Sequence, residues 1–179
     1  LVRSDLALFQ KNVLAFLQNR FPYVSYRVVH RDEKVTVRQL TIIRYTAMNR
    51  YRTFSNDRAI QLIRELYFTG YGINEQECRP TDLLYIGRRE VKQRNLINED
   101  EIMAALAPLG FRKIEPGGMP HAEQVRTFAN AKIIVAAHGT ALTNVLFCMP
   151  GAAVIEISPA NLVQSVFFWM TRKMGLGYD

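Results

Sequence analysis

Two apolar runs rich in β-branched residues, with a short helical pattern between them, constrain the fold of this 179-residue chain most strongly. Residues 132–137 and 152–157 each have the length and composition of a buried strand. Residues 140–147 fit a short helix, and Pro150-Gly151 marks the turn that follows it. A strand, a helix and a second strand in this order form a crossover unit, which indicates a parallel sheet.

The same alternation extends across residues 82–179. Further strands are expected at 83–86 and 111–114, and helices at 98–110, 121–131 and 161–174. Asn98 is a typical N-cap residue, and the acidic turn after it suits the positive end of a helix dipole. We therefore predict an α/β fold over this region, with a Rossmann-like parallel sheet and helices on both faces.

Residues 1–81 have a less regular pattern. Helices are expected at 4–19 and 56–70, and strands at 23–29 and 34–43. We interpret this N-terminal segment as a partial or linking portion. It either extends the sheet or belongs to a neighbouring lobe.

The net charge of +7 comes entirely from the first third of the chain. Residues 1–60 hold 11 Lys and Arg against 4 Asp and Glu, whereas residues 61–179 hold 12 of each kind. A basic segment suits nucleic acid, a membrane surface or another anionic polymer. A solvated surface is the interpretation that we favour, so no nucleic-acid partner is expected.

Two cysteines and three scattered histidines give no disulfide framework and no metal-ligand spacing. Residues 133–155 carry no formal charge over 23 positions, which is long enough to cross a bilayer. His138, Asn144 and the Pro150-Gly151 turn would be costly in lipid. This stretch is therefore expected to fold as strand, helix and strand.

A basic cluster at positions 88–94 directly follows the expected strand 83–86. Ligands of open α/β sheets bind at the carboxyl ends of the strands. The fork of an arginine donates two parallel hydrogen bonds to a phosphate. The cluster of Arg88, Arg89, Lys92 and Arg94 is therefore a candidate phosphate site as a group, and a solvated charged loop is the alternative.

The segment from His138 to Asn144 lies at the end of the strand 132–137. Gly139 allows close backbone approach to a ligand, and a helix that begins after it favours an anion. Thr140 and Thr143 offer hydroxyl groups beside the Asn144 amide. His138 is either a ligand-binding group or a satisfied structural residue. No Gly-x-Gly-x-x-Gly or Walker motif is present, which weakens a nicotinamide or ATPase interpretation.

Acidic and amide side chains complete the candidate set. Glu156 ends an apolar strand, where a carboxylate without partners is costly to bury. Ribose hydroxyls would supply such partners, and an exposed strand-end carboxylate is the alternative. Glu123 and Gln124 lie in the expected helix 121–131, where outward-facing polar residues are common.

The region 82–179 resembles family 61 glycosyltransferases, because five segments occur in the order found in that family. They are 84–88, 94–99, 123–124, 138–144 and 154–157. The family includes plant xylosyl- and arabinosyltransferases, animal O-linked N-acetylglucosaminyltransferases and bacterial proteins of capsular polysaccharide synthesis. The resemblance implies the C-terminal lobe of a GT-B enzyme, which has two Rossmann-like lobes and binds a nucleotide sugar. Such an enzyme would transfer the sugar with inversion of configuration at its anomeric carbon.

The resemblance also implies roles for single residues. Arg88 and Arg94 would neutralise the donor diphosphate, and Glu156 would bind the ribose. The turn at His138 and Gly139 would line the nucleotide pocket. The remaining implied residues are Thr140, Thr143 and Asn144 at the donor, with Asn98, Glu123 and Gln124 in support. Thr140-Ala141 stands where the family usually has Ala-Gly, which changes how closely a ligand approaches the backbone.

A UDP-linked donor, no metal and no further cofactor, and a glycan or protein acceptor complete what the resemblance implies. Family members are usually much longer, so the acceptor lobe and the catalytic base are expected outside this chain. A bacterial protein would act in surface or capsular polysaccharide synthesis, in the cytoplasm or at the cytoplasmic membrane surface. A eukaryotic one would act in the secretory lumen. The alternative function is a non-catalytic Rossmann-like interaction module that binds an anionic polymer.

Overall fold

The computed structural model describes residues 2–39, 57–87, 96–160 and 165–179. Among them, one sheet of five parallel strands has the order β4-β3-β5-β6-β7. The strands are β3 (Asp82–Ile86), β4 (Phe111–Ile114), β5 (Ala131–Ala137), β6 (Ala153–Ile157) and β7 (Gly177–Tyr178). The predicted α/β class with a Rossmann-like parallel sheet is confirmed.

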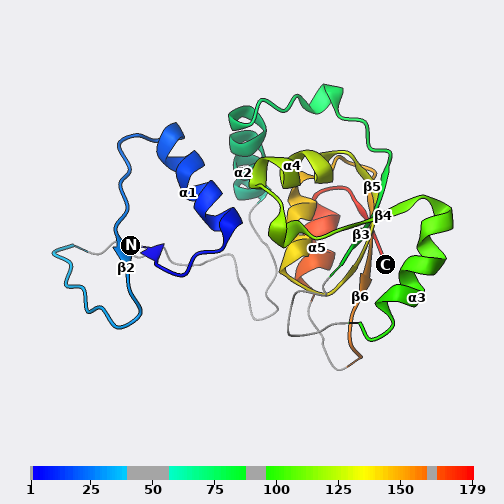
Figure 1. The fold of residues 1–179 in the computed structure, drawn as a ribbon. Coiled ribbons are helices and arrows are strands. Elements are labelled where there is room, and N and C mark those ends of the chain that lie inside the picture. Colours follow the sequence, from blue (N-terminus) through cyan, green and yellow to red (C-terminus); the bar gives the residue numbers. More distant parts are fainter. Residues whose placement is uncertain (1, 40–56, 88–95, 161–164) are drawn as a thin grey trace.

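Helices cover both faces of the sheet (Figure 1). The α-helices are α1 (Leu8–Arg20), α2 (Asp57–Gly70), α3 (Glu99–Leu106), α4 (His121–Ala129) and α5 (Val166–Lys173). The 3-10 helices are η1 (Glu75–Glu77), η2 (Ala107–Leu109), η3 (Pro116–Gly118) and η4 (Thr140–Phe147). Helix α3 lies on one side of the sheet, and α2, α4 and α5 lie on the other.

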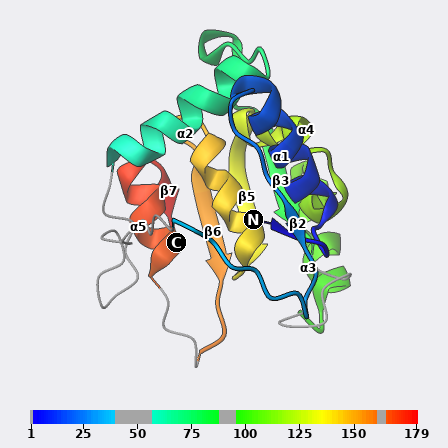
Figure 2. The same ribbon diagram turned by 90° about the vertical axis from the view of Figure 1, so that its left-hand side faces the viewer.

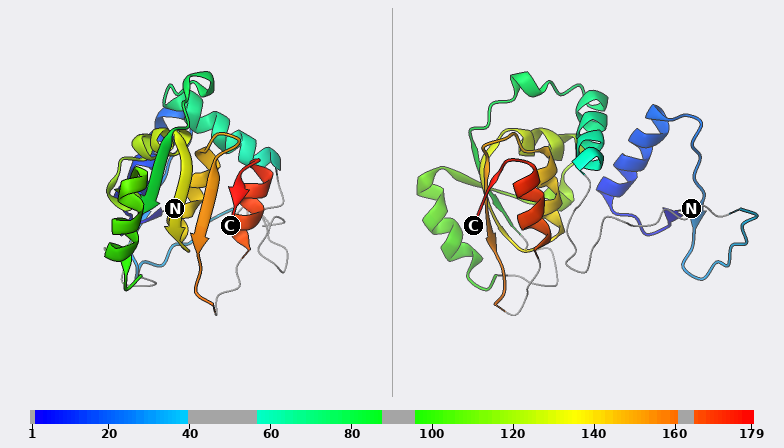
Figure 3. Two further views of the ribbon diagram at one scale, coloured as in Figure 1. Left: turned by 90° about the vertical axis from the view of Figure 1, so that its right-hand side faces the viewer. Right: turned by 180° about the vertical axis from the view of Figure 1, so that it is seen from behind.

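The two faces are covered unequally. In the left panel of Figure 3, α3 lies over the β3–β4 side, while no described helix crosses the same face of β6. Ile155 of β6 is accordingly 40% exposed. The main core therefore lies on the opposite face, between the sheet and the other helices.

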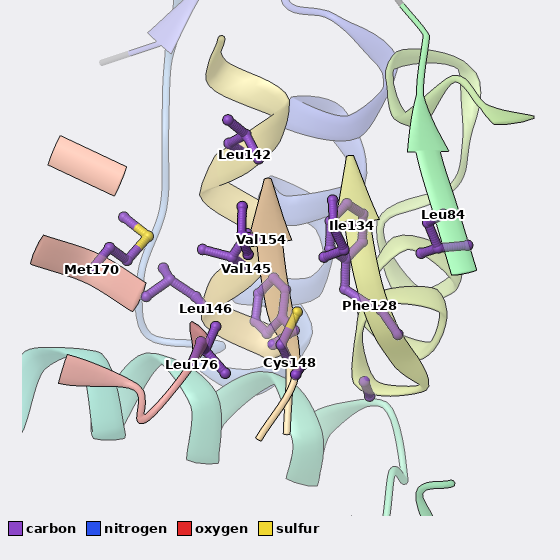
Figure 4. Packing of buried hydrophobic residues seen from close by; sticks show 14 of the residues in the cluster. Leu84, Phe128, Ile134, Leu142, Val145, Leu146, Cys148, Val154, Met170 and Leu176 are labelled. Carbon is purple, nitrogen blue, oxygen red and sulfur yellow. The ribbon is translucent and has the colours of Figure 1, made fainter. Parts of the chain in front are cut away.

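The core is made of apolar side chains from neighbouring strands, packed against α4 and η4 (Figure 4). Leu84 and Ile134 have no exposed surface, and neither does Phe128 of α4. Cys148, at the end of η4, is equally buried and packs in the same cluster as a small apolar residue. Ile134 comes from one of the two apolar runs that predicted the sheet, whereas Leu84, Phe128 and Cys148 come from other parts of the chain.

Helix α2 belongs to this core although it precedes residue 82. Its Ile60 and Phe68 side chains are 3% exposed and lie in the same buried cluster as the strands. Arg64 of α2 is 8% exposed, and its Nη1 donates hydrogen bonds to the carbonyl oxygens of Leu146 (2.5 Å) and Cys148 (2.9 Å). A cation thereby satisfies carbonyl groups at the C-terminal end of η4. The predicted domain boundary at residues 81 and 82 remains a prediction.

The first forty residues pack differently. Helix α1 begins at Leu8 rather than after Ser4, and none of its residues is buried. Its main aromatic contact is Phe16, whose ring centroid lies 5.2 Å from that of Tyr67 and 4.7 Å from that of Tyr71. Figure 2 shows α1 lying outside the layer of helices that covers the sheet.

The predicted N-terminal strands are largely wrong. Of residues 23–29, only β2 (Val28–Val29) is a strand, and it pairs in parallel with β1 (Val2–Arg3) in a separate two-stranded sheet. Residues 34–39 form no strand, and 40–43 lie outside the described residues. Strands need ladder partners, and this segment lies away from the five-stranded sheet.

Several predicted element ends also differ. Helix α3 passes into η2 and stops at Gly110, whose φ of +90° favours glycine, as expected. Asn98 takes the N-cap position but makes no side-chain capping bond, so its predicted capping role is wrong. Helix α5 begins at Val166, and residues 161–164 lie outside the described part.

Residues 133–155 fold as β5, η4 and the start of β6, as predicted. Within the described ranges, no helix is both long and apolar enough to cross a membrane.

Candidate functional site

A pocket of about 520 Å³ follows η4, from the carboxyl ends of β3 and β4 to helix α2. Gly87, which follows β3, and Glu115, which follows β4, line the end of the pocket at the sheet edge. Thr140, Thr143 and Asn144 line its wall along η4. The pocket therefore begins where ligands bind in open α/β sheets, and its volume suits a small molecule.

The polar wall is fixed by amide hydrogen bonds. Asn144 Nδ2 donates to the Gln124 side-chain oxygen (3.1 Å) and to the carbonyl oxygen of Ala141 (3.2 Å). Buried Gln124 donates in turn to the carbonyl oxygen of Met119 (2.9 Å). The threonines at 140 and 143 are exposed on the pocket side of this network. The structure thus brings together Gln124, Thr140, Thr143 and Asn144, four residues of the predicted site.

Two long charged side chains lie close over Gly87 at the sheet edge of the pocket. A Cβ atom at Gly87 would displace the ends of the side chains of Lys113, in β4, and of Glu115, which follows β4. The Lys113 ammonium lies 2.5 Å from the carboxylate of buried Glu99 and 3.3 Å from that of Glu115. The hydrogen bond to Glu99 raises the pKa of Lys113 most, and partial desolvation opposes it. This edge therefore carries paired charges next to Gly87.

The opposite end of the pocket is aromatic. The His121 ring lies edge-on to Tyr67 (4.7 Å between centroids) and to Phe147 (5.9 Å), and all three residues line the pocket. His121 Nδ1 is hydrogen-bonded to the Tyr71 hydroxyl at 2.8 Å. Burial lowers the pKa of His121, and burial together with Tyr67 raises the pKa of Tyr71 to about 12. Both groups are therefore neutral near pH 7, so this end presents an uncharged surface.

Sequence reasoning missed this aromatic end. His121 appears in the sequence as one of three scattered histidines, and Tyr67 lies in a helix whose aliphatic stripe dominates the pattern. The two come together because α2 packs beside α4. The i, i+4 spacing of Tyr67 and Tyr71 was the available signal for an aromatic helix face.

His138 and Glu156 do not line the pocket. The His138 Nδ1 atom is paired with the Glu156 carboxylate, and their side chains are only 4% and 1% exposed. Tyr178 donates its hydroxyl to the other carboxylate oxygen at 2.6 Å. The alternative of an exposed carboxylate at Glu156 is therefore wrong, and its partners come from the protein itself. Gly139 follows with an extended backbone (φ 171°).

The other predicted site residues fall elsewhere. Arg88 and Arg94 lie outside the described residues, although Arg88 directly follows Gly87 of the pocket. Asn98 and Glu123 are exposed and do not line the pocket. Across the described ranges, no group of three or more His, Cys, Asp and Glu side chains is placed to hold a metal ion.

A parallel sheet with a pocket at the carboxyl ends of its strands defines a Rossmann-like ligand-binding domain. The chain belongs to the glycosyltransferase 61 family, whose model matches residues 14–155. The matched region begins within α1 and includes α2, so it reaches well upstream of the motifs that carried the resemblance.

One similar protein is the beta-1,2-xylosyltransferase XYXT1 of Oryza sativa subsp. japonica. It is 31% identical over 93 residues, which are 51% of this chain and 20% of the rice protein. The matched part of the chain thus spans only about a fifth of the length of this relative.

Proposed function

We propose that this chain is the donor-binding part of an inverting glycosyltransferase that uses a nucleotide sugar. The observation that carries the proposal is the pocket beginning at Gly87, at the carboxyl edge of the sheet in a family 61 chain. A UDP-linked donor is the first candidate. The name of the rice relative makes a xylosyl group the first sugar to test.

The chemistry of the pocket supports an uncharged sugar or nucleoside moiety within it. Thr140, Thr143 and Asn144 offer hydrogen-bonding groups for hydroxyls. The aromatic end, with Tyr67 and Phe147, offers flat apolar surface for a base or a sugar ring. None of the described lining residues is Lys or Arg.

The diphosphate therefore needs cations from outside this described lining. Arg88 and Arg94 follow the pocket residue Gly87 in sequence, and the proposal assigns them to the diphosphate. Two arginines offset the charge that develops on the leaving diphosphate, so the proposal includes no metal ion and no other cofactor.

In an inverting transfer, the acceptor hydroxyl loses its proton to a base and its oxygen attacks the anomeric carbon from the opposite side. The bond from that carbon to the diphosphate breaks, and its electron pair leaves with the diphosphate. The proposal places the acceptor site, for a glycan or a protein, and the base in a second lobe. The proposed enzyme has two candidate cellular settings. One is synthesis of a surface or capsular polysaccharide at the cytoplasmic membrane face, and the other is glycan synthesis in the secretory lumen.

Calorimetry with UDP, other nucleoside diphosphates and UDP-xylose tests the proposal. We expect UDP to bind, and Arg88→Ala to weaken binding at least about tenfold, since a charge-assisted contact contributes on the order of 1.5–3 kcal/mol. Arg172→Ala, at an exposed arginine of α5, is the matched control and should bind as the parent does. If the folded parent binds no nucleotide and Arg88→Ala behaves as the parent does, the result would instead support the alternative function, a non-catalytic interaction module that binds an anionic polymer.

A further inference from the structure

Three side chains, in or directly after three neighbouring strands, form a buried hydrogen-bonded chain. His138 directly follows β5, Glu156 lies in β6 and Tyr178 lies in β7. The imidazole and the phenol each contact one oxygen of the Glu156 carboxylate. The Phe167 ring, 5.3 Å from that of His138, packs against the imidazole.

Burial makes each of these contacts matter. A carboxylate removed from water is costly unless its oxygens are hydrogen-bonded, and Glu156 has a side-chain exposure of only 1%. Burial, followed by the hydrogen bond to this carboxylate, raises the pKa of Tyr178. The phenol therefore stays protonated and donates its hydrogen to Glu156. Losing either partner leaves a buried carboxylate oxygen without its donor.

This chain of side chains ends one residue from the pocket wall. The backbone N–H of His138 donates to the carbonyl oxygen of Ile157 (2.9 Å), which extends the β5–β6 ladder by one residue. Gly139 is extended, and its carbonyl oxygen accepts the first helical hydrogen bond of η4, from Leu142 (3.0 Å). Thr140, the first residue of η4, lines the pocket. His138 is thus the last residue held by the sheet before the pocket wall begins.

We propose that Glu156 and Tyr178 are positioning residues, which hold His138 and thereby fix the start of η4 and the threonines that line the pocket. Glu156 acts from inside the fold in this role, in place of binding ribose. The effect on donor binding rests on the proposed function above, whereas the effect on the position of η4 does not.

Tyr178→Phe tests the proposal, because it removes one hydroxyl and keeps the ring. Tyr23→Phe makes the same change at a side chain that is 82% exposed and serves as the control. In amide NMR spectra of the full chain without ligand, Tyr178→Phe should shift the signals of Gly139, Thr140 and Thr143, and Tyr23→Phe should not. The Kd for UDP should rise roughly threefold to tenfold, a part of what a buried hydrogen bond contributes.

Glu156→Gln and the double variant distinguish positioning from general stability. If Tyr178 acts through Glu156, the double variant should bind UDP no more weakly than Glu156→Gln alone, whereas independent effects would multiply. Unmoved η4 amide signals in folded Tyr178→Phe and Glu156→Gln overturn the positioning role, even if both variants melt at a lower temperature. If the η4 signals move in the variants but the parent binds no UDP, the positioning role stands and the proposed function is rejected.

Discussion

The five-stranded sheet and the segment before residue 40 differ in how completely they bury their apolar groups. Leu84 of β3 and Ile134 of β5 have no exposed surface, whereas α1 has no buried residue at all. In the five-stranded sheet, every strand pairs with at least one neighbour, and α2, α4 and α5 cover the face of the sheet that carries the main core. The N-terminal strands β1 and β2 have two residues each and pair only with one another.

The difference shows that stability and ligand contact are divided unequally between the two regions. The sheet region supplies the core and the polar wall of the pocket. The N-terminal region adds Phe9 of α1, which is 38% exposed, to the pocket lining. We therefore expect substitutions in the sheet region to change global stability, and substitutions in α1 to change mainly local order around the pocket.

The largest effect is expected for Phe128→Ala. This ring on α4 is fully buried against the sheet, so its removal leaves a cavity and should lower the free energy of unfolding by about 3–5 kcal/mol. Urea denaturation followed by circular dichroism measures the change. Leu109→Ala, at a side chain that is 66% exposed, should cost less than about 0.5 kcal/mol. Equal losses for both variants would contradict the packing described for the core.

A smaller effect is expected for Phe16→Ala. The ring contacts Tyr67 and Tyr71 without being buried, so its loss should cost about 1–2 kcal/mol. Hydrogen exchange should accelerate in α1 and remain slow in β3 and β5. Leu8→Ala on the same helix, 53% exposed, is the control and should leave exchange unchanged. Acceleration throughout the sheet would break the comparison, because α1 would then be part of the cooperative core.

The smallest effect is a pH dependence from His121. Burial lowers its pKa in the folded chain, so the unfolded chain takes up the proton more readily below about pH 6.5. The contribution of His121 to the free energy of unfolding should therefore be constant above this pH. Below it, the free energy of unfolding should fall by at most about 1.4 kcal/mol per pH unit because of His121.

His121→Gln should remove this part of the slope, since glutamine keeps a hydrogen-bonding group for Tyr71 and does not titrate. Urea denaturation at a series of pH values measures the free energy of unfolding of the parent and of the variant. His30→Gln, at an exposed histidine, is the matched control. A parent slope that His121→Gln leaves unchanged would show that other groups cause the acid sensitivity.

The sequence predicted the sheet where the strands are long and their residues are mainly apolar. The β-branched runs at β5 and β6 are unmistakable, because both faces of these strands are mainly apolar. β7 was missed because two residues, Gly177 and Tyr178, are too few for any periodicity. The strand expected at 23–29 is only two residues long, and residues 34–39 form no strand, because alternating residues alone do not provide a neighbouring strand.

The site was predictable in part for the same reason. Thr140, Thr143 and Asn144 follow a recognisable strand, and topology alone puts them at the carboxyl edge. The partners of Glu156 lie 18 and 22 residues away, one directly after β5 and the other in β7, and no local spacing reveals them. The position of Glu156 at the end of a strand suggested a carboxylate that is open to a ligand. Its burial depends on pairing with residues far away in the sequence and was therefore not predicted.

The guanidinium of Arg64 acts as a C-cap that another helix supplies, because it donates hydrogen bonds to the carbonyl groups of Leu146 and Cys148 at the end of η4. A recombinant fragment that started at residue 82 would remove this cap and leave two inward-facing carbonyl groups without a donor. Expression trials of the isolated Rossmann-like region should therefore retain α2, so that Arg64 stays in place beneath the end of η4.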